Sequence, residues 1–223
     1  MFGVQCSVPL VMRTPHGGGV SAGPQHSQCL EAWFAHVPGL KVVCPSSPYN
    51  AYGLLRSAIK DPDPVVFIEH KALYATKADV PEPLSLIPLG QANIVRSGQD
   101  VTVVTYGASV TLAIGAAERL AADGVSVEVI DLQTLQPWDE QTVLQSLIHT
   151  HRLVIVHEAV EAFGVGAEIA ARIADIGFDE LDGPIIRVGA PFMPVPFAPG
   201  LELSYRPSVD SVISAVRKAM SKE

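Results

Sequence analysis

The sequence has few charged residues, no excess of positive charge and no long apolar segment. Charged residues make up 17% of its 223 residues, and the formal net charge is −8. Domains that bind nucleic acid usually carry a basic face, so nucleic acid is excluded as a partner. No run approaches the ~18 apolar residues of a membrane span, and residues 1–13 lack the pattern of a secretory signal. We therefore expect a cytoplasmic protein without a membrane partner.

Cysteine is scarce as well. Cys6, Cys29 and Cys44 are odd in number and form no CxxC pair. Secreted domains held by disulfides and structural zinc sites both need paired cysteines at short spacing, so neither is indicated. We expect three buried free thiols in a reducing compartment.

Hydrophobic residues, at 48% of the chain, are abundant enough to fill a sizeable interior. In the first part of the chain, short apolar segments alternate with helical patterns. We predict strands at 8–13, 40–44 and 64–68, and helices at 27–34 and 48–59. Apolar strands separated by helices are typical of a parallel sheet that is covered on both faces. Three strands make an incomplete sheet, so an edge and a face are expected to be exposed.

A second α/β alternation follows a proline-rich stretch. Periodicity is lost between residues 70 and 88, and Pro81, Pro83 and Pro88 interrupt that segment. We predict a first domain at 1–70, a linker at 71–88 and a second domain at 89–223. Strands are expected at 101–105, 126–131, 153–157 and 185–188, and helices at 109–122, 139–148, 166–174 and after Pro207. Ser208 is the expected N-cap of the last helix.

Three motifs have ordinary structural explanations. The glycines at 17–19 match neither nucleotide-binding glycine pattern and are interpreted as a tight loop. Gly164 and Gly166 lack the third glycine of a dinucleotide site and are interpreted as the start of a helix. His157 and Glu158 end a strand, but the second histidine of a zinc-binding HExxH helix is missing.

His26 follows the glycine loop and is predicted in the first turn of a helix, at the carboxyl end of a strand. Such a position can direct an imidazole into a cleft. A histidine near a helix start is also often a structural hydrogen-bonding residue. Spacing alone leaves both readings open.

Several long motifs, in one order and across nearly the whole chain, resemble the beta subunit of thiamine-diphosphate-dependent 2-oxo acid dehydrogenases. They are residues 13–15 (RTP), 17–19 (GGG), 23–28 (GPQHSQ), 30–36 (LEAWFAH), 38–43 (PGLKVV), 130–132 (IDL), 137–139 (PWD), 154–158 (VIVHE) and 194–197 (PVPF). The resemblance implies a partial pyrimidine-binding domain followed by a transketolase C-terminal-type α/β domain.

The resemblance also implies a site shared between chains. An alpha subunit would hold the diphosphate and magnesium, and His26 would be the catalytic residue that faces the cofactor's thiazolium and assists proton movement and acyl transfer. A second beta subunit and a lipoyl-bearing acyltransferase core are the other implied partners. Some relatives bind a structural potassium ion, largely through backbone oxygens. The aligned positions are Leu10, Ala58, Ile59, Asp61 and Asp63.

Members of this family have roughly a hundred further residues before the strand at 8–13, including a glutamate that binds the aminopyrimidine. We therefore expect a truncated product, and we do not expect this chain to be active by itself. The predicted reaction is oxidative decarboxylation of pyruvate or a similar 2-oxo acid, with acyl transfer to lipoamide; the sequence does not distinguish pyruvate, branched-chain oxo acids and acetoin. The alternative is a catalytically incompetent module that docks on partner subunits. A single-chain transketolase-like enzyme is disfavoured because the chain has no diphosphate domain.

Overall fold

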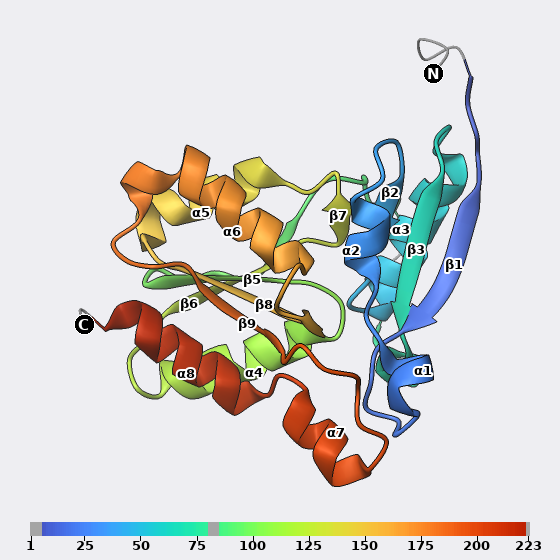
Figure 1. The fold of residues 1–223 in the computed structure, drawn as a ribbon. Helices are drawn as coiled ribbons and strands as arrows, with labels where there is room; N and C mark the ends of the chain where they lie inside the picture. The colour runs from blue at the N-terminus through green and yellow to red at the C-terminus, as the bar shows by residue number, and fades with distance from the viewer. Residues whose placement is uncertain (1–5, 80–84, 222–223) are drawn as a thin grey trace.

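The computed structural model describes residues 6–79 and 85–221, which form two sheets with helices around them (Figure 1). The first part contains β1 (Val11–His16), α1 (Gly23–Ser27), α2 (Glu31–Ala35), β2 (Lys41–Val43), α3 (Pro48–Lys60), β3 (Val65–His70) and the 3-10 helix η1 (Lys71–Leu73). The second contains β4 (Asn93–Arg96), β5 (Val101–Thr105), α4 (Ser109–Ala121), β6 (Val127–Asp131), β7 (Thr134–Gln136), α5 (Glu140–Thr150), β8 (Leu153–Val160), α6 (Val165–Ile176), the 3-10 helix η2 (Phe178–Glu180), β9 (Ile186–Ala190), α7 (Pro199–Tyr205) and α8 (Val209–Met220).

The first sheet has the strand order β1-β3-β2-β7. β1 and β2 run parallel to β3, as predicted, and the register pairs the last residues of β1 and β3, His16 with His70. β7 comes from the second part of the chain and pairs antiparallel with β2. The expectation of a three-stranded sheet was therefore wrong, because a distant segment supplies a fourth strand.

The second sheet has the order β4-β6-β5-β8-β9. Four strands are parallel, and β4 is an antiparallel edge strand paired with β6. Helices α5 and α6 lie on one face, and α4 and α8 lie on the other (Figure 1). This confirms the predicted α/β class, although short strands β4 and β7 and helix α7 were not predicted.

Alternation along the buried strands divides the interior into two main cores. Val103 and Val154 face α4 and α8, whereas Val104 and Ile155 face α5 and α6. The second of these cores continues into the first sheet through residues such as Ile68. One hydrophobic core therefore joins the two parts of the chain.

The segment predicted as a single helix at 27–34 is two short helices. Gln28 has an extended backbone (φ −68°, ψ 147°), which ends α1 and starts a bend before α2. The bend turns the Glu31 side chain inward, where it is 1% exposed. His26 consequently lies in the last turn of α1 rather than in the first turn of a longer helix.

Other local expectations have mixed outcomes. Ser208 caps α8 and forms a capping box with Ser211, as the sequence indicates. Cys44 is buried, but Cys29 is only partly buried and Cys6 is exposed, so the expectation of three buried thiols was wrong. Residues 80–84 of the predicted linker lie outside the described residues. Among the residues described, no helix is long and apolar enough to span a membrane.

Candidate functional site

His26 is exposed in the last turn of α1. Its backbone carbonyl accepts a hydrogen bond from Lys71 Nζ, at the start of η1 directly after β3. The imidazole is therefore free to meet another molecule, while its backbone is tied to the strand behind it.

The glycine loop before α1 is bound by two carboxylates from the second part of the chain. Gly18 N–H donates to Glu158 Oε1 at 2.6 Å, and Gly19 N–H donates to Glu202 Oε1 at 2.9 Å. Ser21 N–H donates to the other Glu202 oxygen at 3.0 Å. Both carboxylates are buried, and hydrogen bonds to ionised groups are about twice as strong as neutral ones. The loop is therefore held in one position relative to β8 and α7.

Glycine is required at two of these positions. Gly17 and Gly19 have φ of +85° and +91°, which side chains rarely adopt. A Cβ on Gly17 would lie 2.1 Å from His70 Nε2, and one on Gly19 would lie 2.6 Å from Arg206 Nη1. The tight-loop interpretation is confirmed, and the loop's glycines also allow it to pack against charged side chains.

Glu158, on β8, connects three separate elements. Its Oε2 lies 3.0 Å from His70 Nε2 and accepts hydrogen bonds from Arg206 Nε and Nη2 at 3.0 and 2.9 Å. Burial raises the pKa of this carboxyl, but His70, Arg206 and the Gly18 N–H outweigh burial and lower the pKa to about 2. Glu158 therefore holds β3, the glycine loop and the end of α7 together as a charged group.

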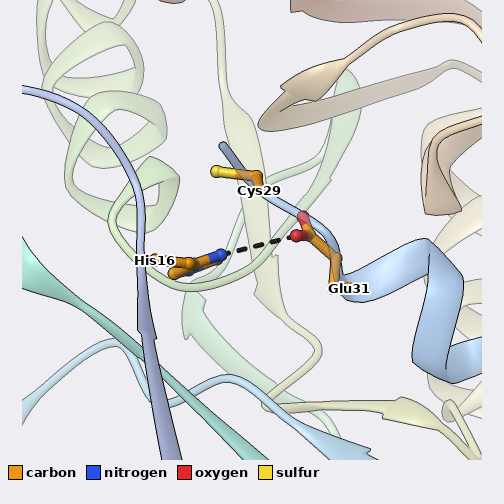
Figure 2. A group of neighbouring side chains, drawn as sticks. All are labelled: His16, Cys29 and Glu31. Atoms are coloured by element: carbon orange, nitrogen blue, oxygen red, sulfur yellow. Dashed lines mark ion pairs between the residues drawn. The ribbon is translucent and has the colours of Figure 1, made fainter. Parts of the chain in front are cut away.

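Glu31, which Figure 2 shows beside His16 and Cys29, links the two parts of the chain at a second point. Tyr106 OH, from the second part, donates to Glu31 Oε1 at 2.7 Å, and His16 Nδ1 lies 3.4 Å from Oε2. Burial raises the pKa of Glu31, but His16 and Tyr106 outweigh it and lower the pKa to about 2.

A third polar junction surrounds Asp131 at the end of β6. Ser46 Oγ lies 2.5 Å from Asp131 Oδ2 and 2.8 Å from Asn50 Oδ1, and Asn50 Nδ2 donates to Gln133 Oε1 at 3.0 Å. Burial raises the pKa of Asp131 to about 7, although Ser46 and the Gln133 N–H act to lower it. One serine proton cannot serve both oxygen acceptors. A protonated Asp131 removes this conflict, because it donates to Ser46 while Ser46 donates to Asn50.

A cavity of about 1260 Å³ opens beside Glu158. Its lining is largely aromatic and apolar, and includes Cys29, Trp33, Phe163, Phe192 and Tyr205, with Glu158 among them. Trp33, Phe163 and Phe192 are 71%, 88% and 75% exposed. Large apolar side chains exposed together are typical of binding surfaces.

The five predicted potassium ligands gather at the end of α3 and the starts of β1 and β3. Leu10 O accepts from Val65 N–H, and Ala58 O accepts from Asp61 N–H. Lys41 Nζ lies 2.6 Å from Asp61 Oδ1 and 3.1 Å from Asp63 Oδ2. The carboxylates thus bind an ammonium group, and only backbone oxygens fit a cation here.

The sequence nominates His26, which remains a prediction, and gives no role to three buried acidic residues of this region. Glu31, Glu158 and Glu202 are buried and contact chain segments 75 to 183 residues away. The HE pair at the end of a predicted strand was a signal, because it lies at the edge where sites of parallel sheets form. Glu202 has no comparable signal, since it lies on a short helix that was not predicted.

Comparison with known proteins defines the class. The family described as "Transketolase, pyrimidine binding domain" matches residues 1–77, and "Transketolase, C-terminal domain" matches residues 90–212. A solved structure described as a split gene transketolase, inactive beta4 tetramer, superposes with a TM-score of 0.79 over 96% of this chain and 68% of its own, at 23% identity. The fold is thus that of a two-domain transketolase-type α/β protein.

Curated relatives narrow the class. The beta subunit of an acetoin:2,6-dichlorophenolindophenol oxidoreductase from Cupriavidus necator is 49% identical over 99% of this chain and 65% of its own length. The pyruvate dehydrogenase E1 component subunit beta of Rickettsia felis is 46% identical over 98% of this chain and 67% of its own. The chain therefore belongs to the transketolase family, in the branch of the dehydrogenase E1 beta subunits. It spans about two thirds of the length of these relatives.

Proposed function

We propose that this chain is the beta component of a thiamine-diphosphate-dependent 2-oxo acid dehydrogenase that acts on pyruvate or a similar small oxo acid. The observation that carries the proposal is the exposed His26 on helix α1, directly after a glycine loop that buried carboxylates hold in place, in a chain that matches dehydrogenase beta subunits throughout. We propose that residues 1–70 and 89–223 are its two domains and 71–88 their linker.

In this proposal His26 is the chain's catalytic residue. Thiamine diphosphate, when bound, supplies the electron sink that decarboxylation of a 2-oxo acid needs. An exposed imidazole fits one side of such a site, since it both accepts and donates protons near neutral pH. His26 would move a proton at the reacting group and orient the lipoyl sulfur. An alpha subunit would hold the diphosphate and magnesium.

The proposed partners are that alpha subunit, a second beta subunit and a lipoyl-bearing acyltransferase core. The exposed aromatic side chains Trp33, Phe163 and Phe192 support docking of another subunit over the cavity. Of the short helix 31–35, Trp33 is the residue free for this, because Glu31 is buried and Ala32, Phe34 and Ala35 pack against the protein core.

The test is co-expression with an alpha subunit. The purified complex, with thiamine diphosphate and magnesium, should reduce 2,6-dichlorophenolindophenol in the presence of pyruvate, a branched-chain 2-oxo acid or acetoin, and neither subunit alone should do so. The rates with the three compounds would identify the substrate. A preparation in which the subunits do not associate, and neither oxidises any of the three, contradicts the proposal.

A second candidate is a non-catalytic docking module. The exposed aromatic surface favours it, because this surface is suited to binding whether or not His26 acts. A complex that forms with the alpha subunit but oxidises none of the three compounds supports this candidate over the first.

A further inference from the structure

Three side chains with metal-binding atoms meet between the end of β1 and the start of α2 (Figure 2). His16 ends β1, Cys29 lies in the connection between α1 and α2, and Glu31 begins α2. The nitrogen, sulfur and oxygen that they offer all lie within 4.8 Å of one another. They come from positions 13 and 2 residues apart, which match no metal-binding sequence motif.

Two of these atoms lack hydrogen-bond partners. His16 and Glu31 are 7% and 1% exposed, and His16 Nδ1 and Glu31 Oε2 form no hydrogen bond with any described residue, although they are 3.4 Å apart. Buried polar atoms are nearly always hydrogen-bonded, so a buried ion pair whose two atoms form no hydrogen bond requires an explanation. A cation between them would satisfy both.

Neighbouring groups fix the orientation of the Glu31 carboxylate and the His16 imidazole, as groups around metal ligands do. Tyr106 OH binds Glu31 Oε1 and leaves Oε2 directed at His16. The His70 ring packs edge-on against His16, with 5.3 Å between ring centroids. Groups that fix the orientation of ligating carboxylates and imidazoles are a regular feature of metal centres.

We propose that His16 Nδ1, Cys29 Sγ and Glu31 Oε2 bind a divalent metal ion of the zinc class. A site of one imidazole, one thiolate and one carboxylate suits zinc, which takes four ligands. Cys29 also lines the cavity, which supplies a route for the ion and room for water as the fourth ligand. Binding replaces the proton of the Cys29 thiol with a sulfur–metal bond, and the proton passes to solvent.

The site would connect to the helix that carries His26. Cys29 is three residues after His26, in the extended connection that separates α1 from α2. A metal bound to Cys29 and His16 would tie this connection to the end of β1. The ion would thereby restrict the position of α1 without contacting His26 itself.

Cobalt(II) is the probe, because it occupies zinc sites and reports thiolate ligation by a near-ultraviolet charge-transfer band. The full chain, stripped with a chelator, should develop this band at a stoichiometry of one ion per chain. Zinc should then abolish it by competition. The Cys6→Ser variant is the matched control, because Cys6 is exposed and far along the sequence from the cluster.

The band should persist in Cys6→Ser and vanish in Cys29→Ser. Tyr106→Phe, which removes the hydroxyl that orients Glu31, should weaken cobalt binding by about 10–100-fold. Cys29 is partly exposed, so its serine variant should fold, and circular dichroism will verify this. Absence of the band in the native chain, or its retention in Cys29→Ser, would overturn the proposal in favour of a metal-free His16–Glu31 ion pair.

Discussion

The two sheets of this protein are completed in different ways. The five-stranded sheet contains only strands from residues 93–190, and its own helices cover both faces. The four-stranded sheet borrows β7 from the second part of the chain, and its glycine loop is held by Glu158 and Glu202 from that part. The part that carries His26 therefore depends on the other part for one strand and for the position of its glycine loop, whereas the core between the second sheet and helices α4 and α8 is formed by the second part alone.

This comparison predicts first that replacing the His26 side chain leaves the stability of the fold unchanged. In an active complex with the alpha subunit, His26→Ala should lower turnover by about 10²–10⁴-fold, the range for a positioned acid or base. The thermal midpoint should stay unchanged, because the side chain is exposed. Steady-state kinetics and a thermal melt measure the two effects. Unchanged turnover would show that His26 has a structural and not a catalytic role. A lowered midpoint would show that its side chain contributes to stability, which contradicts the comparison.

Glu158→Ala should have the opposite profile and destabilise the protein by about 3–5 kcal/mol, because it leaves the buried His70 and the partly buried Arg206 without their anion. Arg172→Ala is the control. Its ion pair with Glu140 lies at the surface and should contribute less than about 1 kcal/mol. Urea denaturation at pH 7 measures the free energy of unfolding of both variants. Equal losses of stability would show that Glu158 does not connect the two parts.

The buried carboxylates of Glu31 and Glu158 predict that acid lowers the stability of the fold. The folded-state pKa values of Glu31 and Glu158 lie below the ordinary 4.5, at about 2. Their contribution to stability is therefore present above pH 4.5 and is lost as pH falls toward 2, by up to about 3 kcal/mol for each group.

Asp131 should act in a separate pH window and with the opposite sign. Its folded-state pKa is raised from 3.8 to about 7 by burial, so the fold favours the protonated form. Stability from this group is present below pH 3.8 and is lost as pH rises through 7, by up to about 4 kcal/mol.

The Asp131→Asn variant cannot titrate at this position. Its free energy of unfolding relative to the native chain should therefore rise between pH 4 and pH 7.5, as measured by urea denaturation across this range. A constant difference would show that Asp131 is ionised in the fold throughout, and would leave the Ser46 proton shared between two acceptors.

The smallest expected effect is a change in thermal midpoint caused by potassium at the predicted site at the outer end of the first sheet. If a potassium ion binds backbone oxygens of Leu10, Ala58 and Ile59, replacing lithium by potassium at constant ionic strength should raise the thermal midpoint. A gain of about 1 kcal/mol corresponds to about 2–4 °C for a chain of this size. Equal midpoints in the two salts would show that no potassium ion binds here and that the Lys41 ammonium alone neutralises the nearby carboxylates.

The sequence predicted the second sheet closely and the first only in part. Strand 101–105 and the cap of α8 are local features, set by an apolar run and by one serine, and both were found. β7 is three residues long and Glu31 lies beyond a bend, so neither has a local signal. Their structure depends on partners far along the chain, Val43 and Tyr106 respectively. Features of this kind arise from tertiary packing, which periodicity does not report.

The borrowed strand also fixes an order of events during synthesis on the ribosome. Val43 pairs with Thr134, so the outer edge of β2 keeps its backbone groups unpaired until the chain through Gln136 has emerged. During that interval the nascent chain presents an open strand edge, which is a template for pairing with other chains. Substitutions that slow translation between residues 44 and 136 should therefore lower the yield of soluble protein more than the same substitutions placed after residue 136.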